Sequence, residues 1–276
     1  MTFQIMRTVP LIFNGFAKIL RSIVFVLVLL LAFLLLVCSI IYIILPEVSA
    51  LDLSNPTTTA FIELRRAEAL QNGTDFQLQW EWVPLSKISP FIVNSLIYSE
   101  DNTFWIHAGI DWYSIMHALN IFWHQHRFVT GGSTITQQVV KNLYLSPDRN
   151  LLRKGRQFLL ALEMERHLSK ERILEIYLNI FEWGDNVFGI EAASKYWFNC
   201  SASELTPNQA VNLALIVPNP LRRDPTTPPL SFNRAINQLL LMLARDGIIS
   251  DEMAIDELNI EIPSGALCED VIYKMF

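Results

Sequence analysis

An uncharged apolar run near the N-terminus limits most strongly what this chain can fold into. From Ser22 to Leu45 no residue carries a charge, and Leu, Val, Ile and Phe predominate. A helix of about 20 apolar residues crosses a hydrocarbon core of about 30 Å. We therefore predict a transmembrane helix over 22–45. A cleaved signal peptide is the alternative, but its apolar region would span only about 7–15 residues and end at a small-residue cleavage site.

The charges in front of this run predict its orientation. Arg7, Lys18 and Arg21 precede it, and residues 1–21 include no acidic residue. Because basic flanking segments stay on the cytoplasmic side, we expect 1–21 to be a cytoplasmic tail and everything after the span to be exported. These charges predict a single pass with the N-terminus in the cytoplasm.

The chain as a whole is acidic, with a formal net charge of −6. This balance argues against a nucleic-acid partner, whose binding needs a basic face. Of the three cysteines, only Cys200 and Cys268 lie beyond the predicted span. They can pair in an oxidising compartment, but their spacing alone does not show that they do.

The exported part divides into a connector and a folded domain. Residues 46–75 are polar and Thr-rich except for a helical run near 60–71, so we expect a connector there and a domain over 76–276. Beyond Ser89 the apolar spacing is helical, which predicts a mainly α domain. The helices are expected at 90–102, 112–124, 135–143, 152–167, 170–181, 189–197, 207–217 and 232–246.

One carboxylate stands where a helix is expected to break. Between Ser99 and Asp111 the chain reads SEDNTFWIHAGID, which places Glu100 at the end of an apolar helix. Partial burial raises the pKa of a glutamate toward the working pH, as a general base for a sugar hydroxyl requires. A Glu-Asp pair at a helix end is more often solvated surface, and these residues alone leave both interpretations open.

An aromatic and apolar stretch follows, from Trp112 to Phe128. Such a stretch is usually buried core. In a chain tethered to a bilayer, however, an aromatic helix can also dip into the membrane interface.

The next segment, from Thr130 to Asn142, reads TGGSTITQQVVKN. Thr134 and Gln137 can cap the helix that follows, and a helix start of this kind favours anions. Basic residues then outnumber acids locally, with Asp148 the one acid among them, and this indicates a phosphate-bearing ligand. A solvated basic surface is the alternative. These basic residues are Lys141, Arg149, Arg153, Lys154 and Arg156.

Five segments, taken in order, resemble the motifs of the peptidoglycan glycosyltransferases. They are SEDNTFWIHAGID, GGSTITQQVVKN, RKGRQ at 153–157, ERILEIYLNIFEWGDNVFGIEAA at 171–193 and LALIVPNPLRRDP at 213–225. The resemblance covers about 82–225 and the N-terminal anchor, and is closest to the monofunctional biosynthetic transglycosylases. It implies a lysozyme-like helical domain with a small hydrophobic jaw, here at about 111–128.

By that resemblance the chain polymerises a lipid-linked disaccharide-pentapeptide, lipid II, into β-1,4 glycan strands. Glu100 is implied as the general base, and displacement of a diphosphate needs cations beside it. The partners implied are lipid II, the growing strand, the cytoplasmic membrane and other cell-wall synthesis or division proteins. The substrate-binding residues implied are Ser133, Thr134, Gln137, Gln138, Lys141, Arg149, Arg153, Lys154, Gln157 and Asn179.

Position 157 departs from the family pattern, in which the RKxxE motif ends in a glutamate. Gln157 cannot neutralise a cation, so we expect less dependence on Mg²⁺ or Mn²⁺ bound with the diphosphate. Glu163 or Glu165 on the same helix is the alternative metal ligand. We expect no organic cofactor.

Two competing functions remain open on the sequence. A lytic, lysozyme-type hydrolase also uses a lone glutamate, but a neutral polysaccharide would not require the basic cluster. A non-enzymatic envelope scaffold of the same fold is the other alternative, and Gln157 motivates it.

Overall fold

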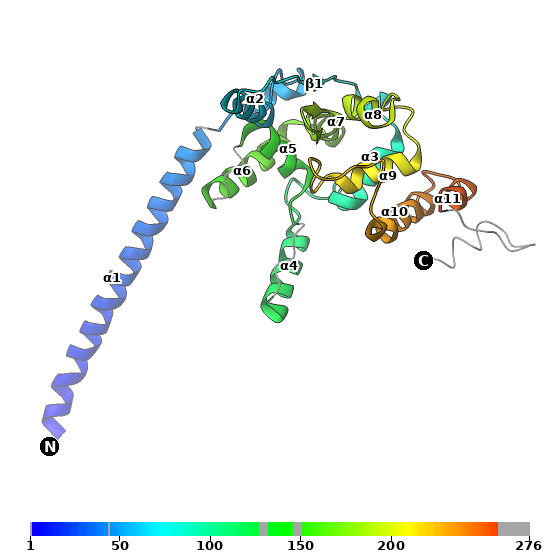
Figure 1. The fold of residues 1–276 in the computed structure, drawn as a ribbon. Coiled ribbons are helices and arrows are strands. Elements are labelled where there is room, and N and C mark those ends of the chain that lie inside the picture. The colour runs from blue at the N-terminus through cyan, green and yellow to red at the C-terminus, as the bar shows by residue number, and fades with distance from the viewer. Residues whose placement is uncertain (1, 44, 127–131, 146–150, 259–276) are drawn as a thin grey trace, which may run out of the picture. The chain divides into compact units, whose positions relative to one another are not determined.

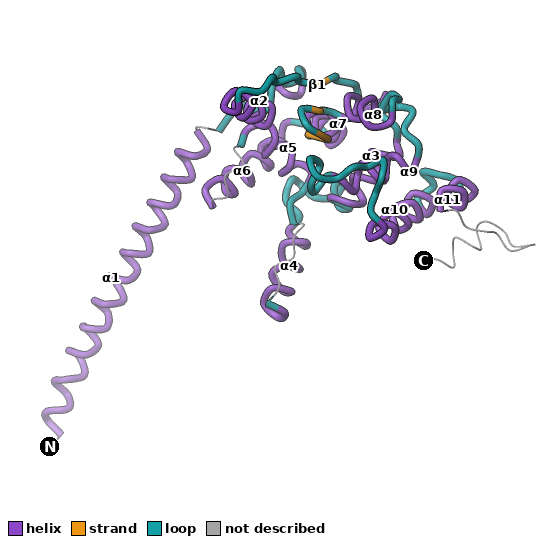
Figure 2. Tube along the Cα trace, viewed as in Figure 1, coloured by secondary structure: helices purple, strands orange, loops and turns teal. Residues whose placement is uncertain are grey.

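The computed structural model describes residues 2–43, 45–126, 132–145 and 151–258 (Figure 1). The chain forms two compact units, residues 1–46 and residues 47–276. Most described residues are helical, as Figure 2 shows by colour, so the expectation of a mainly α protein is confirmed.

The first unit is one long helix, α1 (Thr2–Ile43). Its window Leu20–Val37 has a mean hydropathy of 3.0 and is long and apolar enough to cross a membrane. The helix also continues through the predicted tail, where neither Pro10 nor Gly15 interrupts it. The length and composition expected of the span are thus present in a single element.

The second unit starts earlier in the chain than the sequence predicted. A short 3₁₀ helix, η1 (Ser49–Asp52), and helix α2 (Ala60–Asn72) belong to it. Leu51 and Ile62 are buried, and the Arg172 guanidinium donates to the Leu51 carbonyl at 2.8 Å. The segment expected to be a connector is therefore part of the folded unit.

Helices make up most of the rest of the unit. All described α-helices from Pro90 onward begin and end within a few residues of the predicted bounds except the last, Asp251–Leu258, which the sequence did not predict. Ser89, Ser169 and Thr206 cap three of them with their hydroxyl groups, and Gln209 completes a capping box with Thr206. The helices are α3 (Pro90–Glu100), α4 (Trp112–Gln125), α5 (Ile135–Tyr144), α6 (Leu151–His167), α7 (Lys170–Ile180), α8 (Ile190–Phe198), α9 (Pro207–Ile216), α10 (Asn233–Arg245) and α11 (Asp251–Leu258). The 3₁₀ helices η2 (Leu85–Lys87) and η3 (Leu230–Phe232) lie between them.

A small sheet, which the sequence did not predict, lies beside α7. Its strands are β1 (Gln79–Trp80), β2 (Glu182–Gly184) and β3 (Val187–Phe188), in the order β1-β3-β2. β1 runs parallel to β3, with Gln79 opposite Val187, and β2 is antiparallel to β3. Strands of two or three residues have no alternation long enough to detect.

The core is built around α7, which packs against α5 and places Tyr177 in the interior. Trp183 and Phe188 from the sheet are also fully buried. A second apolar cluster joins α9, α10 and α11. This packing fixes the ends of α3, α5 and α6, where the candidate site lies.

Candidate active site

Glu100 is the last residue of α3, and its half-buried carboxylate opens into a cleft. The Gln138 side-chain amide donates to Glu100 Oε2 at 2.7 Å, and the Tyr177 hydroxyl donates to the Gln138 carbonyl oxygen at 3.2 Å. The Tyr177 contact fixes which end of the Gln138 amide meets the carboxylate. Burial raises the pKa of Glu100, while Gln138 and Lys141 oppose the rise. A carboxylate in this state is suited to accept a proton.

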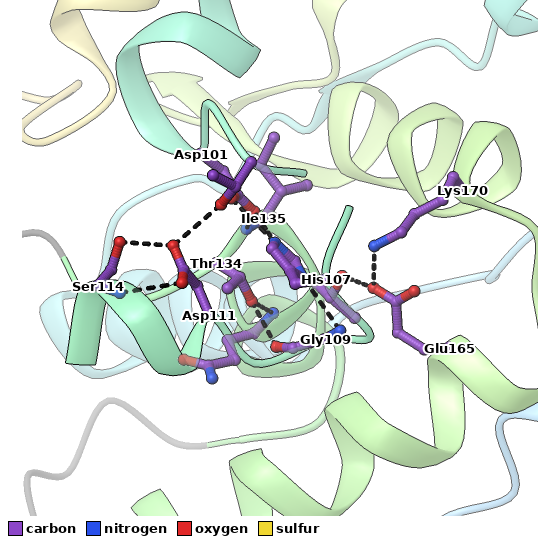
Figure 3. Close-up of polar contacts among 12 residues, drawn as sticks. Asp101, His107, Gly109, Asp111, Ser114, Thr134, Ile135, Glu165 and Lys170 are labelled. Atoms are coloured by element: carbon purple, nitrogen blue, oxygen red, sulfur yellow. Dashed lines mark hydrogen bonds and ion pairs between the residues drawn. The ribbon is translucent and has the colours of Figure 1, made fainter. Parts of the chain in front are cut away.

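The carboxylate of the adjacent Asp101 is instead occupied by hydrogen bonds within the protein. Its carboxylate accepts from His107 Nε2 at 3.0 Å and from the Ile135 backbone amide at 2.9 Å, as Figure 3 shows. The His107 ring in turn accepts from the Gly109 amide at 3.1 Å. Asp101 therefore joins the end of α3, the loop after it and the start of α5. No sequence pattern marked His107 as a residue of this network.

Gly109 is required at its position in the loop. Its φ is +84°, and a Cβ there would lie 2.9 Å from the Ala161 carbonyl oxygen on α6. Its own carbonyl accepts from the Thr134 hydroxyl at 2.7 Å. The loop is thus held between α5 and α6.

The cleft has a volume of about 570 Å³ and gathers residues from distant parts of the second unit. Helices α2, α3 and α5 contribute to its walls, together with β2 and the segment after α9. It is lined by Phe61, Arg65, Ser99, Glu100, Ser133, Gln138, Lys141, Asn142, Phe181, Glu182 and residues 217–221.

Two lysines supply positive charge at this site. Lys154 Nζ donates to the Ser133 hydroxyl at 3.1 Å and to the Gln137 side-chain carbonyl at 3.3 Å. Burial lowers the pKa of Lys141 and of Lys154, and the charge of Arg153 lowers both further. An anion bound beside these cations would relieve their mutual repulsion. The arrangement places a half-buried carboxylate and a cluster of cationic side chains in one region.

The residues predicted for the site divide into two groups. Ser133, Gln138 and Lys141 line the cleft with Glu100. Thr134 caps α5 by accepting from the Gln137 amide, Gln137 is buried beneath Lys154, and Arg153 lies near both lysines. Arg149 and Cys268 lie outside the described residues, so the structure does not test whether Cys268 pairs with Cys200.

Gln157 and Asn179 hold elements together. Gln157 is only 3% exposed and donates to the Gln137 backbone carbonyl at 2.6 Å, which joins α6 to α5. Asn179 is fully buried, and its amide donates to the Val83 and Glu175 carbonyls at 2.8 Å each. Neither side chain lines the cleft.

The two acids considered as alternative metal ligands are engaged elsewhere. Glu165 pairs with Lys170 at 2.7 Å, and Glu163 pairs with Arg166 at 2.9 Å. In the described part of the chain, no three His, Cys, Asp or Glu side chains gather as they would around a metal ion.

Most residues that line the cleft were not predicted as site residues, among them Phe61, Arg65, Asn142 and Glu182. Phe61 and Arg65 lie in the segment taken for a connector, and Arg65 binds Glu182 through two contacts of 2.7 and 2.8 Å. Asn142 and Glu182 lie inside the motif segments, but no pattern distinguished them from their neighbours. Only the folded structure brings these residues, which lie far apart in the chain, into one cleft.

The family model described as Transglycosylase matches residues 67–244. This chain belongs to the transglycosylase family. The transglycosylase is 45% identical over 168 residues to the biosynthetic peptidoglycan transglycosylase of Aromatoleum aromaticum, covering 61% of this chain and 73% of the relative. It is 45% identical over 166 residues to that of Dechloromonas aromatica, covering 60% and 72%. With that of Laribacter hongkongensis the identity is 42% over 167 residues, covering 60% and 73%.

The matched region contains Glu100, both lysines and the whole of α3 to α9. Phe61 and Arg65 of this transglycosylase precede it, although both line the cleft.

Proposed function

We propose that this chain polymerises lipid II into the β-1,4 glycan strands of peptidoglycan at the outer face of the cytoplasmic membrane. One observation carries the proposal: a half-buried glutamate and a cluster of half-buried cations occupy the same region. The names of the relatives support peptidoglycan as the polymer. A glycan hydrolase acting on a neutral chain would have no use for the cations.

The chemistry follows from these groups. Glu100 removes the proton from the acceptor sugar's 4-hydroxyl as its oxygen forms a bond to the donor's anomeric carbon. The bond from that carbon to undecaprenyl diphosphate breaks with inversion, and the diphosphate leaves with the bonding electron pair. Lys141, Arg153 and Lys154 stabilise the developing negative charge, and we expect Arg149 to join them.

The membrane supplies the lipid-linked substrate in this proposal. α1 is the single-pass anchor, with the N-terminus cytoplasmic and the second unit exported. α4 is the hydrophobic jaw: none of its residues is buried, and Trp112 and Trp123 are largely exposed. Its aromatic side chains then enter the membrane interface.

Divalent metal plays a minor part in this proposal. The described residues offer no cluster of acidic ligands, and Gln157 provides no carboxylate. Mg²⁺ or Mn²⁺ could still be carried by the diphosphate itself. We expect polymerisation to survive excess chelator, tested at fixed ionic strength because salt screens the lysine–diphosphate attraction. Loss of activity on chelation would show that metal is required.

The deciding experiment is polymerisation of labelled lipid II by the purified full-length protein in detergent. Long glycan products are the expected result. Release of soluble fragments from polymeric peptidoglycan would favour the lytic function, and absence of both activities would favour the scaffold.

A further inference from the structure

The aromatic ring of Phe61 lies against the ammonium group of Lys141 inside the cleft. Lys141 Nζ is 5.5 Å from the centroid of the ring, within the range of a cation–π interaction. Both side chains are half-buried and both line the cleft. They come from α2 and α5, which pack against each other.

The position of Phe61 is fixed by its neighbours on α2. Thr59 caps the helix by accepting from the Ile62 amide at 3.0 Å, and Ile62 is fully buried. One turn further on, Arg65 makes its two-contact ion pair with the buried Glu182. The ring is therefore held in place before any substrate arrives.

Lys141 needs such support because its surroundings disfavour its charge. Burial lowers the pKa of Lys141, Arg153 on α6 lowers it further, and Glu100 on α3 opposes them. Lys154 on α6 also repels it, and the Arg65–Glu182 pair lines the same cleft. An aromatic face favours the ammonium form without adding a second negative charge beside the base.

We propose that Phe61 is a positioning residue whose ring holds the protonated ammonium of Lys141 where the diphosphate of the donor binds. The inference rests on the proposed function for the role of Lys141. Phe61 acts through the lysine and not on the substrate. It lies ahead of the region matched by the family model, so the family motifs do not include it.

The first test replaces Phe61 by leucine in the full-length protein. Leucine keeps much of the apolar volume and removes the aromatic face, so the ammonium loses its partner and the pKa of Lys141 falls further. We expect kcat/KM for lipid II to fall about three- to tenfold. The alkaline limb of the pH profile should move to lower pH, because Lys141 loses its proton earlier. Phe61→Trp keeps an aromatic face and should leave kcat/KM and the alkaline limb near their wild-type values.

The chain offers a matched control, because a second cation–π contact involves the same helix. Arg66 lies 5.6 Å from the ring centroid of Phe76, and neither lines the cleft. Phe76→Leu should leave kcat/KM and the pH profile unchanged. If Phe61→Leu fails to fold, trifluorinated phenylalanine introduced at position 61 weakens the ring quadrupole with little change of shape and should shift the alkaline limb in the same direction.

A second measurement does not depend on activity. In protein with carbon-13 at the lysine ε positions, Lys141→Gln identifies the Lys141 signal, and its pH titration reports the pKa. Phe61→Leu should lower that pKa and Phe76→Leu should not. An unchanged titration with Phe61→Leu would overturn the inference even if the proposed function holds. Failure of the wild type to polymerise lipid II would refute the proposed function, while the titration still tests the contact.

Discussion

Glu100 and Asp101 are neighbouring carboxylates in different surroundings. Asp101 is buried and accepts hydrogen bonds from His107 and the Ile135 amide, so it has little capacity left for a substrate. Glu100 accepts from Gln138 and otherwise opens into the cleft. The local sequence placed both at a helix end without distinguishing them, because the partners of Asp101 lie 6 and 34 residues away, and only the family resemblance singled out Glu100.

Glu100→Gln should lower the polymerisation rate by about 10²- to 10⁴-fold, because the amide keeps the size of the side chain but cannot accept a proton. The thermal unfolding midpoint should hardly change, since Glu100 is not part of the core. The matched variant Asp101→Asn should instead lower that midpoint, because it weakens the link between α3 and α5. A near-normal rate for Glu100→Gln would show that another group is the base.

Gln138→Leu should shift the acidic limb of the kcat/KM profile to higher pH. The Gln138 amide donates to the charged form of Glu100 and so lowers the pKa of Glu100. Without this donor, less opposes the rise in pKa that burial causes. In the proposed mechanism activity needs Glu100 deprotonated, so it is lost as pH falls through this pKa. Tyr177→Phe keeps the amide and serves as the control, with a smaller shift. A limb that stays in place would contradict the role of Gln138.

At the scale of elements, α2 is the helix whose importance the sequence underestimated. Charged and apolar residues alternate irregularly along it, and its one fully buried side chain is Ile62, so no strong periodicity marks it as part of a domain. Helices such as α5, α7 and α9 were predicted closely because each has a buried apolar face and a capping residue. α2 is held by Arg65, whose partner Glu182 lies 117 residues further along the chain.

Arg65→Leu should destabilise the second unit by about 3 kcal/mol, because it leaves the buried Glu182 carboxylate without its cation. Arg66→Leu is the matched control: Arg66 and its partner Glu63 are both largely exposed, and such pairs contribute about 0–1 kcal/mol. Chemical denaturation of both variants measures the difference. Equal losses of stability would show that the Arg65–Glu182 pair does not secure α2.

The predictions for Gln157 and Asn179 illustrate a limit of motif reading. Both lie in segments that match the family, and both were therefore expected among the substrate-binding residues, with Asn179 in the motif that buttresses the cleft. Gln157 in fact joins α5 to α6, and Asn179 joins α7 to the chain around Val83. A family motif contains residues that bind the substrate and residues that support those. Only their burial and their hydrogen-bond partners in the structure distinguish the two kinds.

At the scale of the whole molecule, an apolar helix and an exposed aromatic helix occur in separate units of one chain. α1 is long and apolar enough to cross a bilayer, and α4 exposes Trp112, Met116 and Trp123 within the folded unit. The sequence predicted the first from length and composition. The local sequence did not decide the location of the second helix, because an aromatic stretch has the same pattern in a buried core and at a membrane interface.

A protein lacking residues 1–45 should still bind liposomes, because the α4 side chains can enter the membrane interface on their own. Replacing Trp112 and Trp123 together by serine should weaken that binding at least about tenfold. Tyr196→Ser, at an exposed aromatic residue of α8, is the control and should change little. Co-sedimentation with vesicles measures all three. A truncated protein that ignores lipid would show that α4 is not a membrane contact.

The adjacency of Glu100 and Asp101 also restricts how this gene can change in length. Successive residues of an α-helix point about 100° apart, so one residue inserted into or deleted from α3 would turn the carboxylates away from their partners. The gain or loss of one codon between Ser89 and Asp101 would move Glu100 out of the cleft or break the hydrogen bond from the Ile135 amide to Asp101. Among descendants of this sequence, gaps should therefore fall in loops such as residues 224–229, which precede η3, and α3 should keep its length while its apolar residues interchange.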